Sequence, residues 1–171
     1  MLVKLLQLFF KLLFRVTVNT SGQTVPPEKL LIIANHESFL DGLLLGLFLP
    51  FRATFVVHTG ILKIWYFRLI LSHVPHLAVD PTSPLAMKKV IKLLEEGKSV
   101  VIFPEGRLTM TGSLMKVYDG PAFVAAKSGA TILPVRLDGP ARSYFSRLSG
   151  NYPRTFFPKI TLTILKPEFI P

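Results

Sequence analysis

Residues 30–50 read LLIIANHESFLDGLLLGLFLP and predict a buried strand that passes through a short polar turn into an apolar helix. The run LLIIA at 30–34 is short, apolar and partly β-branched, as is typical of a buried strand. Residues 39–49 are apolar over a length that suits a helix. His36 then lies in the turn, and Asp41 lies in the first turn of the helix. Because helical side chains lean toward the N-terminus, the carboxylate of Asp41 can reach back to the imidazole of His36.

This turn supports two interpretations. In the first, Asp41 fixes the tautomer of His36 and leaves the other ring nitrogen free to accept a proton, which makes the histidine a general base. In the second, Ser38 is the helix N-cap, Asp41 completes a capping box, and His36 is an ordinary loop residue. Ser38 is a weaker candidate for a nucleophile, because a capping hydroxyl faces backbone N–H groups and the sequence has no G-x-S-x-G elbow.

A second polar motif follows the apolar run SVVIF at 99–103, which predicts another strand. A proline ends this strand, Gly106 permits a tight turn, and Arg107 emerges beside Glu105. Ligands of open α/β sheets bind at the carboxyl ends of strands, and a guanidinium offers paired donors to a phosphate. We therefore expect Arg107 to lie near His36. A surface ion pair between Glu105 and Arg107 is the alternative.

Three blocks carry a family resemblance. NHESFLD at 35–41 resembles the N-H-x-x-x-x-D signature of the PlsC-like glycerolipid acyltransferases. FPEGRLT at 103–109 is similar to the F-P-E-G-T-R-S block of that family, and ILPV at 132–135 is similar to its later apolar-Pro-apolar block. The sequence around the motifs resembles the acyltransferase portion of bacterial bifunctional 2-acylglycerophosphoethanolamine acyltransferase/acyl-ACP synthetases.

The resemblance implies a role for each motif residue. His36 would be the catalytic base and Asp41 its orienting partner. Glu105, Gly106 and Arg107 would hold the glycerophosphate of the acyl acceptor. The resemblance also implies the fold of the family, an α/β domain without a cofactor or a metal.

Two departures from the family pattern concern positive charge. The usual F-P-E-G-T-R order puts the arginine where Leu108 stands, so Arg107 is shifted by one position. The family also often carries an arginine where the segment HLAVD ends in Asp80. Less positive charge at the phosphate would suit a zwitterionic headgroup better than a phosphomonoester.

Composition agrees with one domain that works at a membrane surface. Hydrophobic residues make up 50% of the 171 residues, and mean hydropathy is +0.47. The net charge of +10 favours anionic lipid, an acidic partner protein or nucleic acid. Nucleic acid ranks last, because the basic residues alternate with apolar stripes and form no recognised binding motif. The sequence lacks Cys, and its four His residues lack zinc-site spacing, so we expect neither a cofactor nor a metal.

Residues 1–18 predict an amphipathic helix. Lys4, Gln7, Lys11 and Arg15 recur at spacings of three and four, so they share one face, and Leu, Phe and Val cover the rest. Such a basic helix is expected to lie in a membrane interface, because its apolar run is too short to span a bilayer. Packing on the protein's own core is the alternative. We expect a membrane-associating helix at 1–18 and an acyltransferase domain at 19–171.

The remaining pattern predicts a single α/β domain, with a central, mostly parallel or mixed sheet flanked by helices. We expect further strands at 15–20, 53–57, 74–79, 131–136 and 161–165, and further helices at 61–71, 84–96 and 120–128. Residues 139–159 interleave basic and aromatic residues without an acid, which suits a lipid or carrier-protein contact or a plain solvated loop. The helix at 61–71 is a second candidate for interfacial contact.

Together these features predict a monotopic acyltransferase on the cytoplasmic face of a bacterial inner membrane. By the resemblance, the donor is acyl-ACP, the acceptor is the lysophospholipid 2-acylglycerophosphoethanolamine, and an acyl-ACP synthetase domain is a possible fusion partner. A lysophosphatidic acid acyltransferase is the alternative within the class. A non-catalytic module that binds lipid or a carrier protein is the alternative outside it.

Overall fold

The computed structural model describes residues 2–22, 28–80 and 83–169. The chain forms helices and strands in the following order: α1 (Leu2–Phe14), β1 (Thr17–Thr20), β2 (Leu30–Ala34), α2 (Asp41–Phe48), β3 (Thr54–His58), the 3₁₀ helix η1 (Thr59–Lys63), α3 (Trp65–Leu71), β4 (His76–Val79), α4 (Pro84–Glu95), β5 (Val100–Ile102), α5 (Gly120–Ser128), β6 (Thr131–Asp138), the 3₁₀ helix η2 (Pro140–Arg142) and β7 (Thr161–Ile164).

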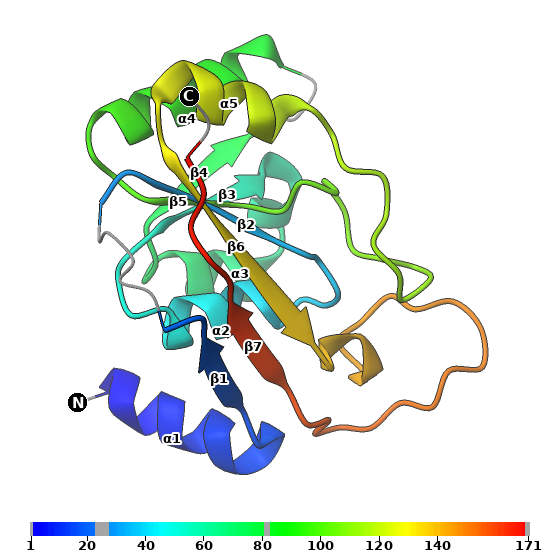
Figure 1. Cartoon of the computed structure of the whole chain (residues 1–171). Coiled ribbons are helices and arrows are strands. Elements are labelled where there is room, and N and C mark those ends of the chain that lie inside the picture. Colours follow the sequence, from blue (N-terminus) through cyan, green and yellow to red (C-terminus); the bar gives the residue numbers. More distant parts are fainter. Residues whose placement is uncertain (1, 23–27, 81–82, 170–171) are drawn as a thin grey trace.

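The described strands form one seven-stranded sheet in the order β1-β7-β6-β2-β5-β3-β4. Every neighbouring pair is parallel except β6 and β7, which are antiparallel. The expected single α/β domain with a mixed sheet is therefore confirmed (Figure 1). Strand β2 lies in the middle of the sheet and pairs with β6 on one side and β5 on the other.

Strand β2 divides the hydrophobic core into two layers because its side chains alternate between the faces of the sheet. Leu30 and Ile32 belong to a cluster with residues of α1 and α2, and Leu31 belongs to a cluster with residues of α4 and α5. All three side chains are fully buried. The sheet is thus covered by helices on both faces, which explains why LLIIA carries no polar residue.

The predicted helices and strands are found close to their expected positions, but one expected helix is divided into two. The expected helix at 61–71 is split, because Ile64 adopts an extended conformation between η1 and α3. The ring of His58 caps η1 by accepting a hydrogen bond from the backbone N–H of Gly60 at 2.8 Å. The helix expected at 39–49 begins at Asp41, after a turn in which the backbone N–H of Asp41 donates to the carbonyl of Ser38 at 3.2 Å.

Helix α1 packs on the protein's own core along one stripe, which is the alternative arrangement in the sequence analysis, and its membrane contact stays a prediction. Phe10 and Phe14 are buried against α2 and the sheet, and the side-chain amide of Gln7 donates to the carbonyl of Leu47 at 2.6 Å. A wide apolar arc remains exposed on the same helix: Val3, Leu5, Leu6, Leu8, Phe9 and Leu12. Core packing therefore uses only a narrow stripe of α1. None of the described helices is both long and apolar enough to cross a bilayer.

Candidate active site

Three connections meet at one edge of the sheet because they follow three parallel neighbouring strands. Residues 35–40 follow β2, residues 103–119 follow β5, and residues 139–159 follow β6. The carboxyl ends of parallel strands point to the same edge, which is where open α/β sheets bind ligands. Figure 1 shows the two long connections leaving the sheet on that side. The motifs that the sequence analysis selected therefore lie together.

The imidazole of His36 is held by Asp41, as the spacing predicts. Its Nδ1 lies 2.9 Å from Oδ2 of Asp41. The same oxygen accepts the backbone N–H groups of Glu37 at 2.6 Å and of Ser38 at 2.8 Å. The side chain of His36 is 22% exposed, whereas that of Asp41 is fully buried. Nδ1 thus faces the carboxylate, and Nε2 is left as the nitrogen that can exchange a proton with a substrate.

The capping box of the alternative interpretation is formed only in part. The carboxylate of Asp41 reaches back to the N–H of Ser38, and the hydroxyl of Ser38 accepts the N–H of Leu40 at 2.9 Å. The N-cap residue of the helix, however, is Leu40 and not Ser38, and it makes no side-chain cap hydrogen bond. Burial raises the pKa of the Asp41 carboxyl above its ordinary value, and the bonds from His36 and the backbone offset part of that shift. A buried carboxylate in this position stabilises a positive charge on the imidazole.

Two further contacts fix the His36 ring and its backbone. The ring of Phe103 stacks on the imidazole, with 4.0 Å between ring centroids and 14° between planes. The backbone N–H of Thr109 donates to the carbonyl of His36 at 2.8 Å. Both residues come from the connection that follows β5. The site is consequently assembled from two segments about 70 residues apart in the chain.

Glu105 joins these two segments through backbone hydrogen bonds. Its Oε1 accepts the N–H of His36 at 2.9 Å, and its Oε2 accepts the N–H of Met115 at 2.9 Å. The residue is 2% exposed. The structure therefore shows a positioning role for Glu105, and a direct contact with the substrate stays a prediction.

Gly106 and Arg107 lie at the surface of the turn that follows Glu105. Gly106 has a φ of +66°, a conformation that glycine adopts without strain. Arg107 is exposed and has neither an ion pair nor a side-chain hydrogen bond among the described residues, so the alternative ion pair with Glu105 is not formed. Leu108 is 7% exposed. The one-position shift from the family pattern thus carries the arginine from a buried position to an exposed one.

Asn35 and Glu37 also build the site, although the sequence analysis assigned them no role. The amide of Asn35 exchanges two hydrogen bonds of 2.8 Å with the backbone of Leu137 and donates to Glu37 at 3.1 Å. The other oxygen of Glu37 accepts the N–H of Ala141 at 3.0 Å. Desolvation raises the pKa of Glu37 to about 7. The sequence signal for this role was the position of Asn35 directly after a buried strand. A side-chain amide at the end of a strand can continue the hydrogen bonding of the sheet with the neighbouring strand.

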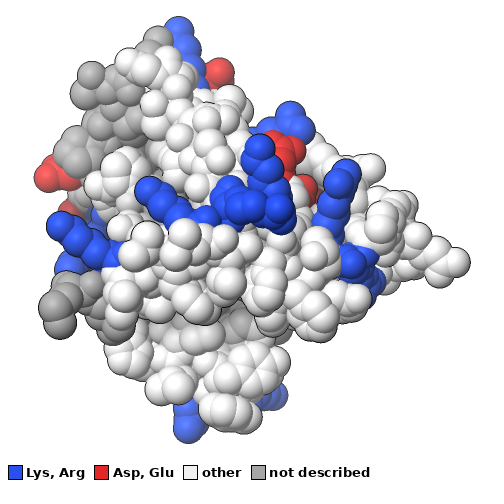
Figure 2. Space-filling model, turned by 90° about the horizontal axis from the view of Figure 1, so that it is seen from below, with Lys and Arg blue, Asp and Glu red and all other residues white. Residues whose placement is uncertain are grey.

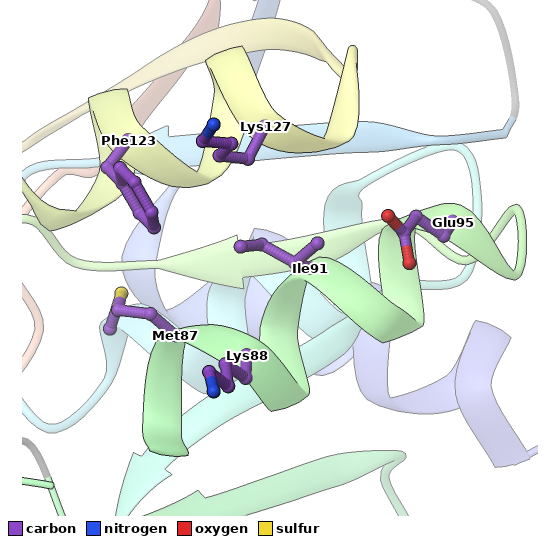
Figure 3. Close-up of a pocket in the computed structure, with 6 residues that line it drawn as sticks. All are labelled: Met87, Lys88, Ile91, Glu95, Phe123 and Lys127. Atoms are coloured by element: carbon purple, nitrogen blue, oxygen red, sulfur yellow. The ribbon is translucent and has the colours of Figure 1, made fainter. Parts of the chain in front are cut away.

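A groove between two helices shares no lining residue with this site. It lies between α4 and α5, and Figure 3 shows its lining residues: Met87, Lys88, Ile91, Glu95, Phe123 and Lys127. None of them belongs to the three connections around His36. Within the described part of the chain, no three His, Asp or Glu side chains gather into a possible metal site.

The fold and the His36–Asp41 pair define an α/β protein with an oriented histidine at the sheet edge, and comparison with known proteins identifies the family. The model of the Acyltransferase family matches residues 15–138, which is more than half of the chain. The protein therefore belongs to the Acyltransferase family.

Named relatives lie within one group of acyltransferases. The chain is 36% identical over 116 residues to the chloroplastic 1-acyl-sn-glycerol-3-phosphate acyltransferase LPAT1 of Arabidopsis thaliana, covering 64% of the chain and 32% of the relative. It is 30% identical over 125 residues to the 1-acyl-sn-glycerol-3-phosphate acyltransferase of Borreliella burgdorferi. This match covers 69% of the chain and 49% of the relative. The chain thus spans about a third to a half of the length of these curated relatives.

A solved structure has the same fold. The 1-acyl-sn-glycerophosphate acyltransferase PlsC from Thermotoga maritima superposes with a TM-score of 0.71 at 24% sequence identity. The match covers 96% of this chain and 68% of that one.

Proposed function

We propose that this chain is an O-acyltransferase that moves an acyl chain from a thioester to the free hydroxyl of a lysophospholipid. The observation that carries the proposal is the contact of 2.9 Å between Nδ1 of His36 and the buried carboxylate of Asp41. This contact directs Nε2 toward a substrate. Membership of the Acyltransferase family supplies the reaction class.

In the proposed reaction, Nε2 of His36 takes the proton of the acceptor hydroxyl as the oxygen attacks the thioester carbonyl. Asp41 stabilises the imidazolium that forms. When the tetrahedral intermediate collapses, the carbon–sulfur bond breaks and the imidazolium returns the proton to the leaving thiolate. Ser38 is fully buried and its hydroxyl accepts the N–H of Leu40, so we expect no acyl-enzyme at this residue. Both substrates must then be bound together.

The names of the relatives favour 1-acyl-sn-glycerol-3-phosphate as the acceptor over the 2-acylglycerophosphoethanolamine that the sequence motifs suggest. We assign its phosphate to the exposed guanidinium of Arg107, on the turn that Gly106 permits, because a planar fork matches phosphate geometry. An acyl-ACP donor and a fused acyl-ACP synthetase domain remain predictions from the motif resemblance.

The proposal is tested with purified protein and a matrix of two acceptors and two donors. Lysophosphatidic acid and 2-acylglycerophosphoethanolamine are each assayed with acyl-ACP and acyl-CoA. His36→Ala and Asp41→Asn should each lower kcat by about 10²–10⁴, the usual contribution of a general base. Circular dichroism is the control for folding. A folded variant that keeps a wild-type kcat would refute the catalytic role, and absence of turnover with all four pairs would favour the non-catalytic binding module.

We further propose that α1 holds the enzyme as a peripheral protein on the cytoplasmic face of a bacterial inner membrane. Support comes from the exposed apolar arc of the helix and from the exposed Lys4 and Lys11 beside it. Each basic residue near an anionic surface contributes about 1 kcal/mol. Lys4→Glu with Lys11→Glu should therefore weaken binding to anionic vesicles by at least a factor of roughly 30. Flotation at physiological salt measures this, and unchanged flotation would move the contact to another surface.

A further inference from the structure

The connection between β6 and β7 exposes a cluster of aromatic side chains, which we call the aromatic loop (residues 142–157). Five of its rings are between 44% and 64% exposed: Tyr144, Phe145, Tyr152, Phe156 and Phe157. Tyr144 lies 4.5 Å from Phe156, and Phe156 lies 6.4 Å from Phe157, measured between ring centroids. Monomeric soluble proteins rarely expose a contiguous apolar patch of this kind unless it binds something.

The aromatic loop continues the exposed surface of α1. The ring of Phe14 contacts Phe157 edge-on at 5.4 Å, and the guanidinium of Arg15 donates to the carbonyl of Phe157 at 2.8 Å. The C-terminal end of α1 therefore contacts the end of the loop. Figure 2 views the molecule from the side on which α1 lies and shows a band of basic side chains across a largely uncharged surface with few acidic groups.

The opposite end of the aromatic loop reaches the candidate active site. The carbonyl of Phe145 accepts the N–H of Phe39 at 3.1 Å, within the turn between His36 and Asp41. The guanidinium of Arg147 lies over the ring of Phe39, 5.3 Å from its centroid. The loop thus contacts both α1 and the turn that carries His36.

The chemistry of this surface fits an anionic bilayer. Residues 139–159 carry three arginines and one lysine but no acid. Aromatic rings and arginines concentrate at the headgroup level of membranes, where a ring buries its apolar body and a guanidinium meets phosphate. The adjoining arc of α1 is mainly aliphatic, which a bilayer can solvate and a nucleic acid cannot stack on. An acidic carrier protein would leave this aliphatic arc uncovered.

We propose that the aromatic loop is a second membrane-contact element, which inserts its rings into the headgroup layer and delivers the lysophospholipid laterally to His36. Delivery of the lysophospholipid to His36 is the only part of this inference that rests on the proposed function. The membrane contact itself is independent of turnover and is measured separately.

Tryptophan fluorescence tests the membrane contact. Trp65 is the single tryptophan of the sequence, so Trp65→Phe provides a dark background. Phe156→Trp in this background reports the aromatic loop, and Phe123→Trp is the matched control. Phe123 is 50% exposed and points from α5 into the groove of Figure 3. The vesicles contain phosphatidylglycerol and phosphatidylcholine, together with lipids brominated near the headgroup. The fluorescence of the Phe156→Trp variant should be quenched and blue-shifted by them, and that of the Phe123→Trp variant should not change.

A pair of serine substitutions tests the delivery step. Tyr144→Ser with Phe156→Ser should raise the apparent KM for lysophospholipid in vesicles at least about tenfold, because two rings lose their burial in the interface. The KM for the same lysophospholipid in detergent micelles should stay within about twofold, and Phe123→Ser should change neither value. Activity in micelles reports the proposed function, so its failure is distinguishable from failure of the membrane contact.

Three results would overturn the proposal. The first is equal quenching, or no quenching, of the two tryptophans. The second is a raised KM for acyl-ACP in micelles, which would assign the loop to an acidic carrier protein. The third concerns the variant with Tyr144→Ser and Phe156→Ser. If it binds vesicles like the wild type but no longer binds a single-stranded oligonucleotide, the aromatic loop is a nucleic-acid contact.

Discussion

Replacement of Glu105 separates a positioning residue from a substrate-binding one. The carboxylate is 2% exposed and accepts two backbone N–H groups, from His36 and Met115, each at 2.9 Å. A hydrogen bond to a charged group contributes about 1.5–3 kcal/mol. Glu105→Gln keeps one acceptor oxygen and turns an amide NH₂ toward the other N–H, so it should destabilise the fold by about 2 kcal/mol. Glu105→Ala removes both bonds and should cost about 3–6 kcal/mol.

Thermal unfolding followed by circular dichroism measures this loss. A destabilisation of about 2 kcal/mol corresponds to a fall in Tm of roughly 4–8 °C for a domain of this size. Turnover is then measured well below both Tm values. We expect kcat to fall more than the acceptor KM rises, because the displaced group is the backbone of His36. Glu96→Gln is the control, since that carboxylate is exposed and pairs only with Lys98 at 2.7 Å.

Two outcomes would refute this reasoning. An unchanged Tm for Glu105→Ala would mean that the carboxylate does not hold the two segments together. An unchanged Tm with a strongly raised acceptor KM would assign Glu105 to the substrate, as the motif resemblance implies.

The other predictions concern three neighbouring positions. Arg107→Ala should raise the KM of the acceptor far more than that of the donor, and Arg107→Lys should restore only part of the loss, because an ammonium cannot copy the fork; equal effects on both substrates would move the phosphate to another basic residue. The pKa of Glu37 is raised from 4.5 to about 7 on folding, so its protonated form favours the folded state, and the free energy of unfolding should fall as pH rises through this window. Glu37→Gln should flatten that dependence in urea titrations, and a wild-type slope in the variant would contradict it. Gly106→Ala should lower stability by about 1–2 kcal/mol in the same titrations, because φ is +66° there.

The local parts of the site were predictable from the sequence. A strand, a turn and a helix follow one another within residues 30–50, so the contact between His36 and Asp41 depends only on spacing and on the lean of helical side chains. The same reasoning left a capping box as the alternative to an oriented histidine. In the structure the carboxylate of Asp41 bonds both the ring of His36 and the N–H of Ser38, but Leu40 and not Ser38 is the N-cap of the helix.

The sequence predicted that the segments after residues 34 and 103 meet at one edge of the sheet, but not the individual contacts between them. Glu105 binds a backbone N–H group 69 positions away, and Glu37 binds one 104 positions away. A backbone N–H group has no sequence signature, and only the register of the sheet brings it near the carboxylate. The stacking of Phe103 on His36 has the same origin, because it requires β5 to lie beside β2.

The orientation of single side chains in tight turns was also beyond the sequence. The motif resemblance showed only that the arginine is shifted from position 108 to 107, and the structure adds that Leu108 is buried and Arg107 is exposed. For α1 the sequence favoured a membrane interface over the protein's own core. The structure shows Phe10 and Phe14 packed on the core and a wider apolar arc exposed, so the membrane contact stays a prediction.

The stacking of Phe103 on His36 restricts how an acyl transfer could proceed. One edge of the imidazole is bonded to Asp41 and one face is covered by Phe103, so both contacts oppose rotation of the ring. A single nitrogen, in a single orientation, would have to meet first the acceptor oxygen and then the departing sulfur. Both atoms must therefore come within reach of Nε2 on the same side of the ring. Between the two proton transfers the substrates, rather than the imidazole, would have to move.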